Sequence, residues 1–311
     1  MQDGLIVKAL SGFYYVQPDE GGGTVQCRAR GLFKKQGIAP LVGDRVKFER
    51  DESGSVKGEG TVVELYPRST ELVRPPVANV DTALLVFAVT EPELNVNLLD
   101  KFLVLAELAG LEPVISLTKS ELLHSEYKTG QAAEALRAKI GRLQSVYEAI
   151  GYRVFSVSAR SGEGTDALRA LLDGRITVFA GQSGVGKSSL LNCLVPGLTL
   201  ETNEISQKLG RGKHTTRHVE LYRIGASGLV ADTPGFSQLE FPDVEPERLT
   251  QAFPEFAKLA GSCKFRGCLH LQEPSCRVRD AVDRQEADSG RYENYTMFLT
   301  EIKERKRRYP R

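Results

Sequence analysis

The strongest constraint on the fold is the segment 181–188, which reads Gly-Gln-Ser-Gly-Val-Gly-Lys-Ser and matches the pattern G-x-x-x-x-G-K-[ST] at every fixed position. It follows a β-rich apolar run, Ile176–Ala180, and opens a helix-like segment, Ser188–Leu194. Glycines in such a loop let backbone N–H groups point inward onto phosphate oxygens, and the helix N-terminus adds partial positive charge. A glycine-rich strand–helix turn is the alternative, but strand, loop and helix together favour a phosphate-binding loop.

The residues of this loop have separate expected roles. Lys187 is expected to bridge the β- and γ-phosphates of a nucleotide, and the Ser188 hydroxyl to bind Mg²⁺. Asp232 ends a predicted strand, begins the sequence Asp-Thr-Pro-Gly and suits the aspartate that completes such a magnesium site. D-x-x-G alone is a common turn, but after a phosphate loop it indicates contact with the γ-phosphate. The expected contacts are Gly181, Gln182, Ser183, Gly184, Val185, Gly186, Lys187, Ser188, Ser189, Asp232 and Gly235.

Two earlier segments are similar to the loops with which GTPases read guanine. Residues 118–121, Thr-Lys-Ser-Glu, depart from the pattern N-K-x-D at both outer positions. The glutamate keeps a carboxylate for the N1 and N2 donors of guanine, and the lysine stem can stack on the base. Because the threonine lacks a carboxamide, an ATPase with relaxed base selectivity stays open. The expected base-reading residues are Thr118, Lys119, Glu121, Ser158 and Ala159, the last two from a Ser-Ala loop.

The order of these segments is unusual. The base-reading segments near residues 118 and 158 precede the phosphate loop at 181, whereas ordinary GTPases begin with the phosphate loop. Circular permutation moves the chain ends but leaves loops at the carboxyl ends of the strands. From residue 80 onward, strand-length apolar runs alternate with helical periods; strands are predicted over 83–89, 113–117, 153–157 and 176–180, and helices over 98–109, 131–150, 165–172 and 187–194. This pattern predicts a mostly parallel sheet covered on both faces.

The first 70 residues have a different pattern. Short alternating runs are separated by Gly and Asp turns, which indicates strands; they are Leu5–Ala9, Phe13–Gln17, Thr24–Ala29, Arg45–Glu49 and Gly60–Tyr66. Five short strands suit a small closed barrel such as an OB-fold, and a different five-stranded barrel remains open. The Pro- and Arg-containing segment 67–76 is predicted to be a linker.

Five cysteines, an odd number, argue against a disulfide scaffold. Three of them form the pattern Cys263-x₄-Cys268-x-His270-x₅-Cys276. Three thiolates and one imidazole with no open position describe a structural, tetrahedral Zn²⁺ site, one per chain. Four unrelated residues are the alternative.

Together these motifs resemble the bacterial family of ribosome small subunit-dependent GTPases A, the RsgA family, over nearly the whole chain. The segments that carry the resemblance are Gly43–Val46, Thr118–Glu121, Gly181–Ser188, Gly212–Thr216, Asp232–Phe236 and the Cys cluster. The resemblance implies a multidomain protein: an OB-fold RNA-binding β-barrel over residues 1–70, an α/β circularly permuted P-loop GTPase domain over 71–238, and a small α-rich zinc-binding domain with a basic C-terminal helix over 239–311.

The resemblance also implies an activity. It implies a GTP hydrolase that forms GDP and phosphate with Mg²⁺, binds the small (30S) ribosomal subunit and its 16S rRNA during late maturation, and is stimulated by that subunit. A nucleotide-gated RNA-binding module, in which hydrolysis is incidental, is the alternative. We expect a cytoplasmic monomer with no membrane partner, because no run reaches the roughly 18 apolar residues of a membrane-spanning helix and no signal peptide is visible.

Residues 206–217 have the features of a switch loop. They are polar and glycine-rich, with four basic residues and no acid, and lie where a magnesium-contacting threonine belongs. Thr215 and Thr216 both fit, and Thr216 is carried as a catalytic candidate beside Lys187. In Ras a glutamine near D-x-x-G positions the attacking water, whereas Phe236 follows the motif here. Slow intrinsic hydrolysis is expected, with His214 as the candidate to supply the missing function; contact of His214 with RNA or solvent is the alternative.

The net charge of +1 conceals local segregation of charge. Residues 28–50 carry seven basic and two acidic side chains, and residues 301–311 carry six and two. Residues 239–255 carry five acids and one base. Phe33 and Phe48 lie within the first basic segment, where basic and aromatic side chains are expected to follow a nucleic-acid backbone and stack bases. For the C-terminal segment, a solvated helix end is the alternative to RNA contact.

Overall fold

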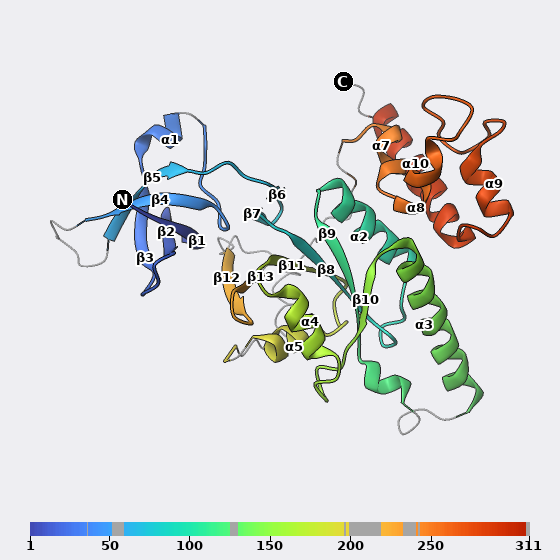
Figure 1. Cartoon of the computed structure of the whole chain (residues 1–311), viewed down its shortest axis with the longest axis horizontal. Helices are drawn as coiled ribbons and strands as arrows, with labels where there is room; N and C mark the ends of the chain where they lie inside the picture. Colours follow the sequence, from blue (N-terminus) through green and yellow to red (C-terminus); the bar gives the residue numbers. More distant parts are fainter. Residues whose placement is uncertain are drawn as a thin grey trace. The chain divides into compact units, whose positions relative to one another are not determined.

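The computed structural model describes residues 1–35, 37–51, 59–124, 130–195, 197–198, 219–232, 241 and 243–308. The chain divides into two compact units, each formed from two separate stretches of sequence. Figure 1 labels the helices and strands of the chain. The first unit comprises Met1–Leu84 and Gly164–Ser237, and the second comprises Leu85–Glu163 and Gln238–Arg311. No helix in the described part of the chain has the length and apolar character needed to cross a membrane.

Five strands of the first unit form the expected barrel: β1 (Gln2–Leu10), β2 (Phe13–Pro18), β3 (Val25–Ala29), β4 (Arg45–Arg50) and β5 (Glu59–Leu65). β1 pairs antiparallel with both β2 and β4, and β5 pairs with β3 and β4, so the strand ring closes. Alternate side chains such as Ile6, Val16 and Val62 are fully buried inside it. The five-stranded barrel prediction is confirmed, and a short helix, α1 (Gly31–Lys35), interrupts it between β3 and β4.

The two phenylalanines expected to stack bases are instead core residues. Phe48 is fully buried and Phe33 is 8% exposed. The stacking prediction is therefore wrong, because strand alternation turns Phe48 into the barrel. Several basic side chains of this segment also pair with acids: Arg45 with Asp19, Arg30 with Glu49 and Lys47 with Glu64. These pairs lower the positive charge that the barrel offers to a nucleic acid.

The segment predicted as a linker contains a hairpin of β6 (Glu71–Val73) and β7 (Pro76–Ala78). The guanidinium of Arg68 donates hydrogen bonds of 2.7 and 2.8 Å to the fully buried carboxylate of Asp44. Gly43 has φ +91°, and a Cβ there would lie 2.0 Å from the carbonyl oxygen of Ala78. The Gly43–Asp44 pair therefore fastens the barrel to this hairpin, which explains both residue types structurally.

The first unit also contains the strands that border the predicted phosphate loop. β11 (Ile176–Ala180) pairs in parallel with β13 (Gly228–Asp232), and β12 (Val219–Ile224) pairs antiparallel with β13. β12 also pairs with β1 of the barrel, where the ammonium of Lys8 lies 2.9 Å from the carboxylate of Glu220. Two helices, α4 (Thr165–Leu172) and α5 (Lys187–Leu194), accompany these strands.

The second unit contains a further parallel pair, β9 (Glu112–Thr118) with β10 (Arg153–Ser156). β8 (Thr82–Ala88), whose seven residues are all buried, begins in the first unit and ends in the second. The helices of this part are α2 (Val96–Leu108), a 3₁₀ turn η1 (Ser120–Leu123) and α3 (Gln131–Ile150). The expected parallel strands and intervening helices are thus present.

The C-terminal part of the second unit is α-rich, as predicted. Its helices are α7 (Pro246–Gln251), α8 (Pro254–Ala260), α9 (Arg277–Asp283) and α10 (Ser289–Arg308). An aromatic cluster fills their core: the ring of Phe253 lies 5.3 Å from those of Phe256 and Tyr295, the latter edge-on. Packing of these aromatic rings stabilises helices such as α7 and α8, which are too short to persist alone.

A buried ionic cluster joins these helices to α2 and α3 within the second unit. Asp100 of α2 is fully buried and accepts hydrogen bonds from Arg291 (2.7 Å), Asn294 (2.6 Å) and the Tyr147 hydroxyl. Arg291, 1% exposed, also donates to Glu255 at 2.8 Å. Burial and the Asp100 charge raise the pKa of Tyr147, so its hydroxyl remains a donor.

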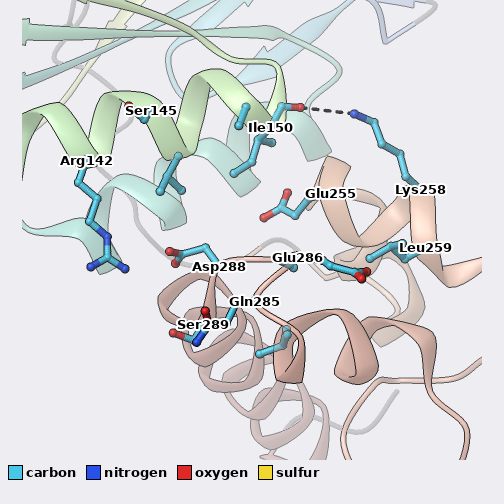
Figure 2. A pocket seen from close by; sticks show the side chains of 14 residues that line it. Arg142, Ser145, Ile150, Glu255, Lys258, Leu259, Gln285, Glu286, Asp288 and Ser289 are labelled. Atoms are coloured by element: carbon cyan, nitrogen blue, oxygen red, sulfur yellow. Dashed lines mark hydrogen bonds between the residues drawn. The ribbon is translucent and has the colours of Figure 1, made fainter.

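Figure 2 shows the surface beside this cluster, where the end of α3 faces α8 and the loop that precedes α10. The ammonium of Lys258 lies 3.5 Å from the carbonyl oxygen of Ile150, and a pocket of about 750 Å³ opens beside them. Arg142 and Lys258 line it together with Glu255, Glu286 and Asp288. Because basic and acidic side chains both line this pocket, it does not present the uniformly positive surface that favours a phosphate.

We predict that Arg291→Met lowers the free energy of unfolding by about 3 to 5 kcal/mol, because it leaves the Asp100 carboxylate buried without its cation. The added substitution Asp100→Leu should recover most of the loss. Urea unfolding followed by tyrosine fluorescence measures both effects.

The matched control is Arg45→Met, which breaks the Arg45–Asp19 pair, whose side chains are 46% and 41% exposed. Its expected cost is below about 1 kcal/mol. Equal losses for the two arginine variants would contradict the structural role assigned to the buried cluster.

Candidate nucleotide site and metal centre

The predicted phosphate loop lies between β11, which ends at Ala180, and α5, which begins at Lys187. Three of its residues, Gly181, Gly184 and Gly186, have φ values of +145°, +80° and +94°. Only glycine adopts these angles without strain, so the backbone explains the glycines of the motif. Val185 differs from its neighbours: its side chain is 1% exposed and anchors the loop to the core.

The side chain of Lys187 lies folded over this loop. Its ammonium donates to the carbonyl oxygen of Gly181 at 2.8 Å and to that of Gln182. Burial lowers the pKa of Lys187 to about 8, and no carboxylate pairs with it among the described residues. A bound phosphate would supply the missing negative charge. Ser188, which is 8% exposed, follows Lys187 in the first turn of α5. Its hydroxyl would hold Mg²⁺.

Strand register brings Asp232 to the same edge as the loop. Because Ile176 pairs in parallel with Leu229 and Val178 with Ala231, β11 and β13 end side by side. Asp232 is the last residue of β13, and its backbone is described. Its side chain lies outside the described residues, as do Gly235, the switch loop with His214, Thr215 and Thr216, and Phe236. Their roles stay predictions.

In the second unit, the two base-reading loops follow neighbouring parallel strands. The N–H of Ser120 donates to the carbonyl of Val157 at 3.2 Å, which ties the loops together. Thr118 is 2% exposed and its hydroxyl donates to the carbonyl of Phe87 at 3.2 Å. The Ser158 hydroxyl, fully buried, accepts from the N–H of Ser161 at 3.1 Å. These two hydroxyls therefore fix the shape of the loops.

Other residues of these loops differ in their side-chain contacts. The ammonium of Lys119 donates to the carbonyl of Glu91, and Ala159 is half-buried. Oε2 of Glu121 is buried and has no hydrogen-bond partner among the residues that the structure describes. A buried carboxylate oxygen without a donor costs free energy, and the adjacent N–H groups of guanine would remove that cost. Adenine offers no such pair of donors on one edge, so the unpartnered oxygen of Glu121 is compatible with the predicted recognition of guanine.

The predicted metal ligands come together in the second unit. The ligand atoms of Cys263, Cys268, His270 and Cys276 all lie within 4.8 Å of one another. Nδ1 of His270 is 3.3 Å from the sulfur of Cys276 and 3.7 Å from that of Cys263. Burial raises the pKa of Cys268 to about 12 and lowers that of His270, so both groups would be neutral without a cation. Three sulfurs and one nitrogen converging in a buried space fit zinc, which stabilises the thiolates.

Residues that the sequence did not single out hold this centre in shape. The Glu273 carboxylate accepts hydrogen bonds of 2.9 and 2.8 Å from the N–H groups of Leu269 and Leu271. The Tyr292 hydroxyl donates to the carbonyl of His270 at 2.6 Å. A contact from a distant helix leaves no local sequence signal, whereas Glu273 lies inside the cluster and was detectable as a turn-capping acid.

Comparison with known proteins decides the family. The RsgA GTPase family matches residues 65–242, and the RsgA N-terminal domain matches residues 3–58. The chain belongs to the RsgA GTPase family. A Bacillus cereus protein named "Small ribosomal subunit biogenesis GTPase RsgA" is 52% identical over 309 residues, covering 99% of this chain and 100% of the relative. A protein of the same name from Geobacillus kaustophilus is 51% identical with the same coverage.

Two solved structures extend the likeness to the fold. YloQ, described as a circularly permuted GTPase, has a TM-score of 0.82 and 42% identity, covering 100% of this chain and 97% of that one. YjeQ from Thermotoga maritima has a TM-score of 0.83 and 38% identity, with 97% and 98% coverage. The circularly permuted GTPase fold predicted from the order of motifs is therefore confirmed.

Lys187→Met should weaken GTP binding about a hundredfold, because the phosphates lose their buried cation. Without nucleotide the variant should be as stable as the parent or more so, because a desolvated ammonium has been removed. Titration with a fluorescent GTP analogue and thermal unfolding measure the two effects. Lys139→Met, at an ammonium 2.9 Å from Glu93 on the surface, is the control; an unchanged affinity for Lys187→Met would contradict the assignment.

Cys276→Ser should remove the bound zinc and loosen α9 and α10, whereas Cys193→Ser, outside the cluster, should keep one zinc ion per chain. The reason is that a three-ligand set loses the closed tetrahedron that holds the ion. Elemental analysis gives the metal content and hydrogen exchange gives the helix protection. Equal zinc content in both variants would show that the four residues are not the metal site.

Proposed function

We propose that this protein is a GTP hydrolase that binds the small ribosomal subunit, acts in its late maturation and is stimulated by it. The observation that carries the proposal is the phosphate loop with the desolvated Lys187, in a chain of the RsgA GTPase family. The name of the Bacillus relatives, a small ribosomal subunit biogenesis GTPase, supports the partner. Binding of 16S rRNA, a monomeric state and a cytoplasmic location belong to the same proposal.

We assign roles to the proposed residues as follows. Gly181–Ser189 bind the phosphates, with Lys187 neutralising the β- and γ-phosphates, and Gly235 adds a backbone contact. Ser188 and Asp232 hold Mg²⁺, which when bound neutralises charge on the phosphate oxygens. Thr118, Lys119, Glu121, Ser158 and Ala159 form the base-reading loops, in which Glu121 accepts from guanine. The domain limits proposed for these functions are 1–70, 71–238 and 239–311.

The experiment that tests this function is hydrolysis of GTP and of ATP, each with and without purified small ribosomal subunits. The proposal expects GTP turnover that rises strongly with subunits and little ATP turnover. Equal ATP turnover would overturn the guanine assignment, and GTP turnover that ignores the subunits would overturn the ribosomal one. Nucleotide-dependent subunit binding without stimulated turnover would favour the nucleotide-gated binding module.

We further propose that His214 supplies the function that Phe236 cannot, with Thr215 or Thr216 of the same loop contacting Mg²⁺. His214→Ala should abolish subunit-stimulated turnover while leaving GTP affinity unchanged, because the side chain acts on the attacking water and not on the bound nucleotide. Stimulated hydrolysis and GTP titration measure the two quantities. The matched control is His124→Ala, at a histidine 3.1 Å from Glu163 outside the predicted site; stimulated turnover retained in both variants would exclude His214.

A further inference from the structure

The loop of the metal centre carries an exposed aromatic ring. Phe265 lies between Cys263 and Cys268 and is 45% exposed, the only exposed aromatic side chain among the residues that the structure describes. A single exposed apolar side chain is ordinary on a protein surface, so the ring alone indicates nothing. Its neighbours on the loop and beside it supply the argument.

The flanking residues give the ring a positive surrounding. Lys264 and Arg266 are both exposed, and neither has an ion-pair partner among the described residues. The Lys264 ammonium lies 5.6 Å from the centre of the Phe265 ring. From residue 256 to residue 272 the chain has three basic residues and no acid, and the next acid, Glu273, directs its carboxylate to backbone N–H groups.

The surface beside the ring is hollowed. A pocket of about 620 Å³ is lined by Lys264, Phe265 and Arg266, by Thr250 and Gln251 of α7, and by the metal ligands Cys263, Cys268 and His270, so part of this space belongs to the metal centre. The amide of Gln251, which is exposed, can pair with a base edge, whereas the buried Thr250 hydroxyl is bonded to Tyr295 and Glu247 keeps the pocket from being purely cationic.

The loop is also held in place before any partner arrives. Cys263 and Cys268, on either side of the ring, belong to the converged ligand set, and Gly267 takes φ +70° to close the turn. A ring on a fixed turn loses little conformational entropy on binding, which favours stacking. By contrast, Phe33 and Phe48 are buried and cannot stack.

We propose that Phe265 is a base-stacking residue, and that the Phe265 loop with Lys264 and Arg266 binds an unpaired RNA base and its flanking phosphates. An exposed ring between two cations, beside a polar hollow, fits a single-stranded nucleic acid, whose bases stack and whose phosphates pair with the cations. An acidic protein surface would satisfy the cations but leave the ring and the hollow unused. The inference rests on the proposed function, since the ribosomal subunit would present the RNA.

The absence of tryptophan from the chain makes the test direct. Phe265→Trp introduces the only indole ring of the chain, whose emission can be excited apart from that of the tyrosines, and a base stacked on it quenches that emission. Oligoadenylate should quench the full-length Phe265→Trp variant, and added salt should release the quench. The control Met297→Trp, at a residue of α10 that is 56% exposed, should not be quenched. No quench at Phe265→Trp, or an equal quench in both variants, overturns the proposal.

A second arm uses purified small ribosomal subunits. Phe265→Leu, which keeps apolar volume without a π-face, should weaken binding to the subunit about tenfold. Phe265→Tyr, which keeps the aromatic ring, should bind the subunit as the parent does. The stacking role is overturned if Phe265→Leu binds as the parent does, or if Phe265→Tyr binds as weakly as Phe265→Leu. Equal zinc content in all variants excludes a disturbed metal centre.

The two arms separate this inference from the proposed function. If subunits fail to stimulate the parent protein, the ribosomal function fails, while the oligoadenylate quench still decides the stacking role. If the parent is stimulated and Phe265→Leu binds as the parent does, only the inference about Phe265 fails. Cross-linking of the loop to a ribosomal protein in place of RNA would likewise overturn it.

Discussion

Parallel pairing of strands determines where each predicted nucleotide-binding loop of this protein lies. In the first unit, the register of β11 with β13 places the phosphate loop and the backbone of Asp232 at one edge. In the second, the register of β9 with β10 does the same for the two base-reading loops. Neither register depends on the order in which the strands occur along the chain. A permuted sequence therefore keeps its loops at the carboxyl ends of its strands.

Buried polar groups have opposite roles in the helical cluster and in the predicted nucleotide-binding loops. Asp100 and Arg291 are buried with each other and with further hydrogen-bond partners, so their desolvation is compensated within the protein. The half-buried ammonium of Lys187 has no charged partner among the described residues. The buried Oε2 of Glu121 has no hydrogen-bond donor among them. Compensated charges hold helices together, whereas uncompensated ones favour a ligand of the missing charge or donor. This contrast supports a nucleotide with phosphates and a base bearing N–H donors.

Sequence reasoning predicted much of the fold because its strongest signals are local. The helices 131–150, 165–172 and 187–194 and the strand 176–180 have the predicted limits, since a glycine precedes each helix, a glycine follows the strand, and apolar periods lie within each segment. The four metal ligands were also recognisable from spacing alone, and they converge.

The errors arose where tertiary contacts decide. Phe33 and Phe48 looked available because basic residues surround them in sequence, but strand alternation and the barrel interior bury Phe48. The hairpin β6–β7 was predicted as a linker, since six residues in two short strands give no periodic signal. Phe265 was passed over because its exposure and the hollow beside it exist only in the folded loop. The spacing of residues along the sequence is enough to identify metal ligands, whereas the exposure of a side chain is known only from the folded structure.

The central claim is the proposal that the phosphate loop binds the phosphates of GTP and that the base-reading loops, which precede it in the sequence, recognise guanine. Hydrogen exchange of the full chain with and without a non-hydrolysable GTP analogue tests this most directly. The account predicts added protection in residues 118–121, 158–160 and 181–188 with the GTP analogue, and protection confined to 181–188 with the ATP analogue. Equal protection by both analogues, or none at residues 118–121, would contradict it.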